Sequence, residues 1–149
     1  FAVVHFGDVY GSDGWFYDML VKRLEKNTFR MPKGGDYYKG FVHIEDAVGS
    51  MISVLEHKSF GESFIVADSM PITFKEFSNF TADQISAKHP GSVPMFLAKA
   101  VLGGDLIKLL TTSMKVSNKK ISEIYEFKYP NYKDGIKQII SELKEKNRI

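Results

Sequence analysis

Histidine and acidic side chains are the residues of this chain that could bind a metal ion, and their spacing argues against it. The four histidines stand at positions 5, 43, 57 and 89, without a His-x-x-x-His pair, and the chain has no cysteine. Structural zinc sites are built from such closely spaced histidines and from thiolates. His43, Glu45 and Asp46 are close in sequence, but alternating strand residues face opposite sides. We therefore expect no metal site.

Motifs for nucleophilic catalysis and for phosphate binding are also missing. No Gly-x-Ser-x-Gly segment occurs, so a hydrolase triad has no recognisable nucleophile. The glycine pairs at 34–35 and 103–104 lack the Lys-Ser/Thr of a phosphate-binding loop and the spacing of a dinucleotide fingerprint. Taken singly, these residues indicate no particular reaction.

The length and composition are those of a globular protein. The 149 residues are 44% hydrophobic and 26% charged, which is typical globular usage. Twenty basic against eighteen acidic residues leave a net charge of +2, so we expect no nucleic-acid partner. No apolar run approaches the roughly 18 residues of a spanning helix, so we expect no membrane partner. The lack of cysteine suits a reducing compartment, and we expect a cytoplasmic protein.

The first half of the chain predicts strands separated by helices. β-Branched and aromatic residues at 1–6 and 63–67 predict buried strands, and Tyr37–Ile44 predicts another short strand. Apolar residues at helical spacing predict helices over 15–26 and from Asp46 to about His57. We expect the Asp46 carboxylate to be the N-cap of the second helix. The strand–helix–strand order predicts a parallel pair of strands and therefore a layered α/β fold.

The second half of the chain predicts mainly helices. Thr73 and Glu76 have the spacing of a capping box, which opens a helix that extends to about Ala87. The other helices are predicted over Met95–Leu110 with an interruption at Gly103-Gly104, over 118–126 after a Ser117 cap, and beyond an Asn131 cap.

Several short segments are more informative in their order than singly. Val3–Gly11 reads Val-Val-His-Phe-Gly-Asp-Val-Tyr-Gly, and Lys39–Ala47 reads Lys-Gly-Phe-Val-His-Ile-Glu-Asp-Ala. They resemble Arg-x-x-Asn-Val-Tyr-Gly-Pro and Arg-Asp-Phe-Val-His-Val-x-Asp-Ala of the extended short-chain dehydrogenases/reductases, the NAD-dependent epimerase/dehydratase family. Gly61–Ala67 is similar to that family's Gly-x-x-Tyr-Asn-Val strand. Pro71–Phe77 and Ser117–Pro130 resemble the helix start and the closing segments that follow.

The resemblance implies an α/β fold with two parts. The terminal strands of a Rossmann-type parallel sheet, at 1–12 and about 46–68, would join a small, mainly helical substrate-binding part at 13–45 and 69–149. The family's N-terminal NAD-binding portion, with its Gly-rich turn, is not in this sequence. The resemblance therefore implies the C-terminal portion of an epimerase or dehydratase that uses NAD or NADP and a nucleotide-sugar-like substrate. We expect the chain by itself to be inactive.

The family's catalytic Tyr-x-x-x-Lys pair has one formal match in this chain. Tyr129 and Lys133 have that spacing, but Pro130 lies between them. The family's pair needs an uninterrupted helix that places both side chains on one face, which a proline prevents. We therefore predict no catalytic residue in this chain.

The resemblance does imply binding residues near the end of the first strand. Phe6 and Gly7 would lie beside the nicotinamide of the cofactor, while Asp8, Tyr10 and Lys39 would contact substrate. Packing in the core is an equally good interpretation of Tyr10. A solvated position on an edge strand is an equally good interpretation of Lys39.

The sequence departs from the family pattern at several of these positions. Asp8 replaces an asparagine and brings a negative charge to where a diphosphate would lie. Lys39 replaces an arginine and loses its bidentate fork. His5 and Ser12 also differ from the family's residues. These changes argue more against a nucleotide-sugar substrate than against the family.

Two alternatives remain open from sequence. The first is a non-catalytic sensor or scaffold module that keeps the fold, which the residues at His5, Asp8 and Gly40 favour. The second is a free-standing domain that binds a small molecule. If the family fold is present, strands 1–6 and 63–67 should leave a sheet edge exposed, or a homo-oligomer should cover it.

Overall fold

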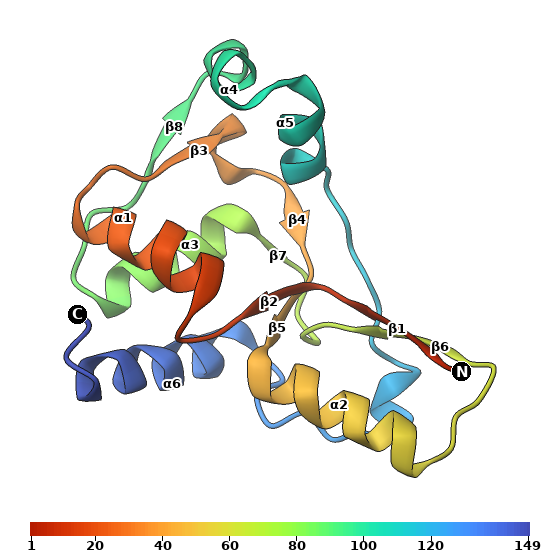
Figure 1. The fold of residues 1–149 in the computed structure, drawn as a ribbon. Coiled ribbons are helices and arrows are strands. Elements are labelled where there is room, and N and C mark those ends of the chain that lie inside the picture. The colour runs from red at the N-terminus through yellow and green to blue at the C-terminus, as the bar shows by residue number, and fades with distance from the viewer.

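Two parallel strand pairs organise the first half of the chain. The computed structural model describes residues 1–149 (Figure 1). Strand β1 (Val3–Phe6) pairs in parallel with β6 (Ser63–Val66), and β2 (Asp8–Tyr10) pairs in parallel with β5 (Phe41–His43). Helix α2 (Ile44–Glu56) connects β5 to β6. The α/β fold class is therefore confirmed, and the strands before and after α2 each pair in parallel, but with β2 and β1 and not with one another.

Four short strands form two further pairs, and three of these strands were not predicted from the sequence. The expected strand at 37–44 is divided at Gly40 into β4 (Tyr38–Lys39) and β5. Strand β4 is antiparallel to β7 (Ile72–Thr73), and β3 (Arg30–Pro32) is parallel to β8 (Gly91–Val93). These strands have two or three residues each, too few to produce a readable alternation of polar and apolar positions.

Most of the predicted helices are present. A π-helical segment at Phe16–Val21 continues into α1 (Lys22–Glu25). Helix α3 (Phe74–Gln84) begins with the predicted capping box of Thr73 and Glu76, and Asn131 caps α6 (Tyr132–Glu145). The apolar stretch forms α4 (Met95–Leu102) and α5 (Gly104–Thr111), separated at Gly103. The predicted helix at 118–126 is limited to a 3₁₀ turn at Ile121–Glu123.

The predicted N-cap of α2 is wrong. The helix begins at Ile44, so His43 is the N-cap, and its Nδ1 accepts a hydrogen bond from the Glu45 amide at 3.2 Å. Asp46 therefore lies in the first turn, fully buried, and its carboxylate accepts hydrogen bonds from a distant segment. The donors are the Tyr125 hydroxyl at 2.8 Å, the Lys128 amide at 2.7 Å and the Tyr129 amide at 2.9 Å.

The buried side chains form two clusters. The larger one lies between the π-helical segment, α3 and α6, and includes Phe16, Phe77 and Ile136. The smaller one lies under α2 and the β1–β6 pair and includes Val54 and Phe64. Because β5 contributes Phe41 to the first cluster and Val42 to the second, it connects the two parts of the molecule.

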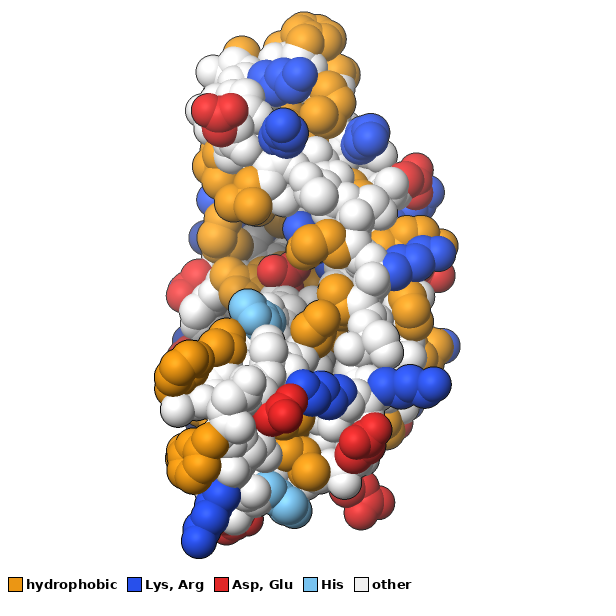
Figure 2. All heavy atoms as spheres, turned by 90° about the vertical axis from the view of Figure 1, so that its right-hand side faces the viewer, with side chains coloured by type: hydrophobic (Ala, Val, Ile, Leu, Met, Phe, Trp, Pro, Cys, Tyr) orange, Lys and Arg blue, Asp and Glu red, His pale blue; other side chains and the backbone are white.

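Large apolar surfaces remain exposed outside these clusters. The hairpin of α4 and α5 projects from the body of the molecule, and Figure 2 shows hydrophobic side chains gathered at that end. Strand β1 pairs only with β6, so its other edge has no strand beside it. Exposed apolar residues flank this edge and line the outer face of α2, namely Val3, Phe6, Val48, Met51, Ile52 and Leu55. A homo-oligomer that covers the β1 edge remains a prediction.

Candidate functional site

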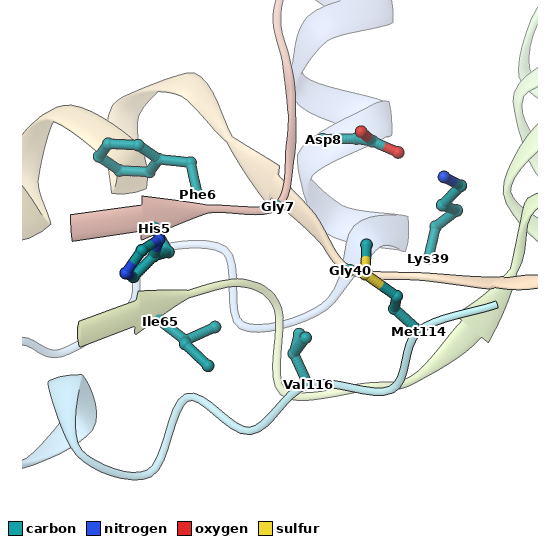
Figure 3. A pocket seen from close by; sticks show the side chains of 9 residues that line it. All are labelled: His5, Phe6, Gly7, Asp8, Lys39, Gly40, Ile65, Met114 and Val116. Carbon is teal, nitrogen blue, oxygen red and sulfur yellow. The ribbon is translucent and has the colours of Figure 1, made fainter. Parts of the chain in front are cut away.

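A pocket of about 410 Å³ lies at the carboxyl end of β1 (Figure 3). Ligands of open parallel α/β sheets bind at the carboxyl ends of the strands. The pocket volume is within the range of small-molecule sites. Four of the five predicted binding residues line it, namely Phe6, Gly7, Asp8 and Lys39. The other five lining residues, which the sequence did not single out as contacts, are His5, Gly40, Ile65, Met114 and Val116.

Close packing of two backbones forms the floor of the pocket. The Gly7 amide donates to the Val66 carbonyl at 2.9 Å, and the next amide, of Asp8, donates to the Gly40 carbonyl at 2.7 Å. A Cβ atom at Gly7 would overlap that Gly40 carbonyl. Glycine is therefore required at position 7, where the chain passes from pairing with β6 to pairing with β5.

Asp8 and Lys39 provide the opposite charges of the pocket. Their side chains extend toward one another in Figure 3, and the Lys39 ammonium hydrogen-bonds to the Leu109 carbonyl and not to Asp8. The Asp8 residue is exposed at the mouth, yet the surrounding protein raises the pKa of its carboxyl, while the Lys39 charge acts in the opposite direction. Lys39 is only 9% exposed, and its ammonium has one protein acceptor, the Leu109 carbonyl at 3.5 Å. Lys39 is thus not a solvated edge residue.

Tyr10, the fifth predicted residue, lies elsewhere. Its ring is buried in the larger cluster, with ring centroids 5.2 Å from Phe77 and 5.5 Å from His43. Burial is the main reason that the pKa of its phenol is raised. Its hydroxyl has no hydrogen-bond partner and faces Gly135 of α6. Tyr10 therefore packs in the core, which was the alternative to substrate contact in the sequence analysis.

His43 is also placed behind the pocket and does not line it. Its Nε2 lies 3.0 Å from the Gln138 Oε1, and its ring centroid is 4.1 Å from that of Tyr129. Burial lowers the pKa of this imidazole below its usual value. These contacts position the start of α2 against α6.

The segment after α5 forms the side of the pocket that sequence reasoning missed. Met114 and Val116 lie in a stretch without regular structure, which runs beside β4. The Met114 amide donates to the Tyr38 carbonyl at 2.9 Å, and the Tyr38 amide donates to the Ser113 hydroxyl at 3.0 Å. No periodicity marks such a segment, so the sequence had no signal that could place it here.

Other candidate chemistry is not assembled around this pocket. Tyr129 precedes α6, Lys133 lies in its first turn, and neither lines the pocket. No group of three His, Asp or Glu side chains is arranged to hold a metal ion. None of the helices combines the length and hydropathy needed to cross a lipid bilayer.

Comparison with curated proteins finds relatives that are 24–27% identical to this chain. No family model matches the chain. A 3-diazoavenalumate denitrifying reductase of a Streptomyces species is 27% identical over 138 residues, which are 90% of this chain and 45% of that protein. The chain thus spans about half the length of the curated relatives that it matches.

Solved structures agree on the fold. A human epimerase family protein with NADPH superposes with a TM-score of 0.86 at 19% identity, covering 94% of this chain and 48% of that one. The dTDP-glucose 4,6-dehydratase of Bacillus anthracis with NAD gives a TM-score of 0.74 at 14% identity, over 97% and 44% of the two chains. The resemblance to the epimerase/dehydratase family is confirmed, and the fold is that of part of a Rossmann-type extended short-chain dehydrogenase/reductase.

Proposed function

We propose that this chain supplies the substrate side of an NAD(P)-dependent oxidoreductase of the epimerase or reductase type. The observation that carries the proposal is the pocket at the carboxyl end of β1, where Phe6, Gly7, Asp8 and Lys39 converge from two separate segments. In the proposed division of the chain, 1–12 and 46–68 form the sheet layer and the remaining residues surround the substrate.

The pocket residues suit a nicotinamide ring on one side. Gly7 has no side chain to obstruct a planar ring, and Phe6 is 37% exposed beside it. Phe6 and Gly7 would therefore hold the nicotinamide of NAD or NADP, which supplies a hydride acceptor or donor when bound. Asp8 and Lys39 would hold and orient the substrate, because they are the charged groups of the same pocket.

Substrates differ between the relatives. One relative is named for a diazo compound and a structural neighbour for a nucleotide sugar, dTDP-glucose. A nucleotide sugar is the substrate class that the family resemblance implies for this chain. Asp8 and Lys39, which replace the family's asparagine and arginine, are the residues on which that choice depends.

A non-catalytic sensor or scaffold module is the second candidate function. The departures at His5, Asp8 and Gly40 favour it, and all three positions line the pocket. A scaffold that had lost its ligand would have no reason to retain an accessible pocket lined by a buried ammonium group. Binding of a nicotinamide cofactor in this pocket therefore separates the proposed function from a scaffold.

Titration of the ¹⁵N-labelled chain with NADPH and NADH tests the proposal. We expect amide shifts at Phe6, Gly7 and Gly40, with affinity reduced about tenfold in Phe6→Ala because aromatic contact with the ring is lost. Phe60→Ala is the matched control, since Phe60 is 70% exposed and outside the pocket. Shifts confined to other surfaces, or none, would contradict the proposal. We also expect no turnover of either cofactor by the chain alone.

A further inference from the structure

The polar lining of the pocket is balanced in charge. Asp8 is its one carboxylate and Lys39 its one ammonium, and the imidazole of His5 lies beside Ile65 (Figure 3). The rest of the lining consists of glycine backbone and the apolar side chains of Phe6, Ile65, Met114 and Val116. A ligand of this pocket meets one strong acceptor and one strong donor between apolar walls.

Lys39 offers hydrogen-bond donors to a ligand. An ammonium group has three N–H donors, and the single protein acceptor of Lys39 is the Leu109 carbonyl at 3.5 Å. The residue is 9% exposed, so water reaches it poorly except through the pocket. A carbonyl oxygen of a ligand in the pocket would therefore replace water at a largely desolvated donor.

Asp8 offers a hydrogen-bond acceptor to a ligand. Its carboxylate accepts no hydrogen bond from a protein side chain, so it is free to accept one from a hydroxyl group of a ligand. The protein around the pocket mouth already disfavours its negative charge, and Lys39 is the nearby cation that compensates it. A second negative charge in the pocket would compete with Asp8 for that single cation.

A nucleoside diphosphate is a poor ligand for such a lining. Its two phosphates each carry negative charge, and proteins usually hold them with several cations or with a row of backbone amides. Here the only ammonium group is shared with Asp8, and no helix N-terminus lines the pocket. The charge balance favours a ligand that is itself neutral.

We propose that the pocket takes a neutral hydroxy-carbonyl compound with an apolar body and that Asp8 excludes nucleoside diphosphates. This inference rests on the proposed function, because it names the substrate class of the same pocket. The ligand hydroxyl donates to Asp8, its carbonyl accepts from Lys39, and its apolar part packs against Met114 and Val116. Asp8 is thereby the residue that determines specificity.

Binding of two probes to the chain and to Asp8→Asn tests this assignment. The probes are 3-hydroxyacetophenone, a neutral hydroxyketone, and UDP-glucose, and affinities are measured from the amide shifts of residues 7, 39 and 40. We expect the wild-type chain to bind the hydroxyketone at least about tenfold more tightly than UDP-glucose, because only the latter brings charge against Asp8. Asp8→Asn should strengthen UDP-glucose binding by about tenfold, since the repulsive charge is removed.

Matched variants separate this effect from general changes in charge. Asp105→Asn removes the same charge from an exposed position on α5 outside the pocket and should leave both affinities unchanged. Lys39→Gln should weaken the hydroxyketone about tenfold, because the charged donor is lost.

Three results would overturn the inference: equal affinity of the wild-type chain for both probes, no gain for UDP-glucose in Asp8→Asn, or no binding of the hydroxyketone. If any of these occurs while NADPH or NADH still shifts Phe6 and Gly7, the substrate class is wrong and the proposed function stands. If neither cofactor shifts those residues, the proposed function itself fails.

Discussion

Replacing Asp46 with alanine is expected to destabilise the fold by about 4 kcal/mol, because a buried carboxylate that accepts three hydrogen bonds is removed. The Lys128 and Tyr129 amides and the Tyr125 hydroxyl would lose their acceptor. These donors precede α6, so Asp46 connects the first turn of α2 to the segment that places the last helix. Urea unfolding followed by circular dichroism measures the free energy of unfolding.

Tyr125→Phe is the matched control for this prediction. It removes one donor and leaves Asp46 with two, so the expected loss is about 1 kcal/mol. If Asp46→Ala were no less stable than Tyr125→Phe, the carboxylate would not have the anchoring role that the geometry gives it. An intermediate loss for Asp46→Asn is expected, because an amide oxygen still accepts.

Replacing Asp68 with asparagine is expected to stabilise the protein, and more so as the pH rises. Asp68 is 7% exposed, and neither of its carboxylate oxygens has a hydrogen-bond partner. Burial, followed by the charge of Asp46, raises the pKa of this carboxyl from 3.8 to about 8. Between these values the folded protein retains a proton that the unfolded chain releases, so stability falls as the pH increases through this window.

The asparagine side chain has no such proton to lose. We expect Asp68→Asn to gain at least about 2 kcal/mol at pH 8 and little at pH 4, from unfolding in urea at both values. Asp105→Asn, which removes an exposed carboxylate, should show no comparable pH-dependent gain. Equal effects of Asp68→Asn at both pH values would mean that the carboxyl is not held protonated in the fold.

Local signals explain what could be predicted from the residues alone. The capping box of Thr73 and Glu76 and the Asn131 cap depend on contacts within three residues, and both are present in the structure. The break at Gly103 is equally local, since its φ of 83° is a conformation that glycine adopts without strain. Asp46 shows the limit of this reasoning, because a one-turn shift of the helix start changed its partners entirely.

The candidate site was predictable only in part. Residues 6–8 lie at the end of the first strand, and Lys39 lies in a segment with a family resemblance, so motif order pointed to four lining residues. Tyr10 was included by the same argument, but it stands at the far end of β2, where its ring packs into the aromatic cluster with Phe16 and Phe77. Met114 and Val116 had no signal, because the segment that carries them is irregular.

The resemblance to a family pointed to the end of the first strand, and the sequence by itself determined the α/β class, most helices and two helix caps, Thr73 and Asn131. These features depend on periodicity, capping and turn chemistry, which act between residues a few positions apart. Only the tertiary structure decided that Lys39 is buried opposite Asp8, that Tyr10 is a core residue and that Asp46 anchors residues 125–129. Each of those outcomes depends on contacts between residues far apart in the chain, which local patterns do not encode.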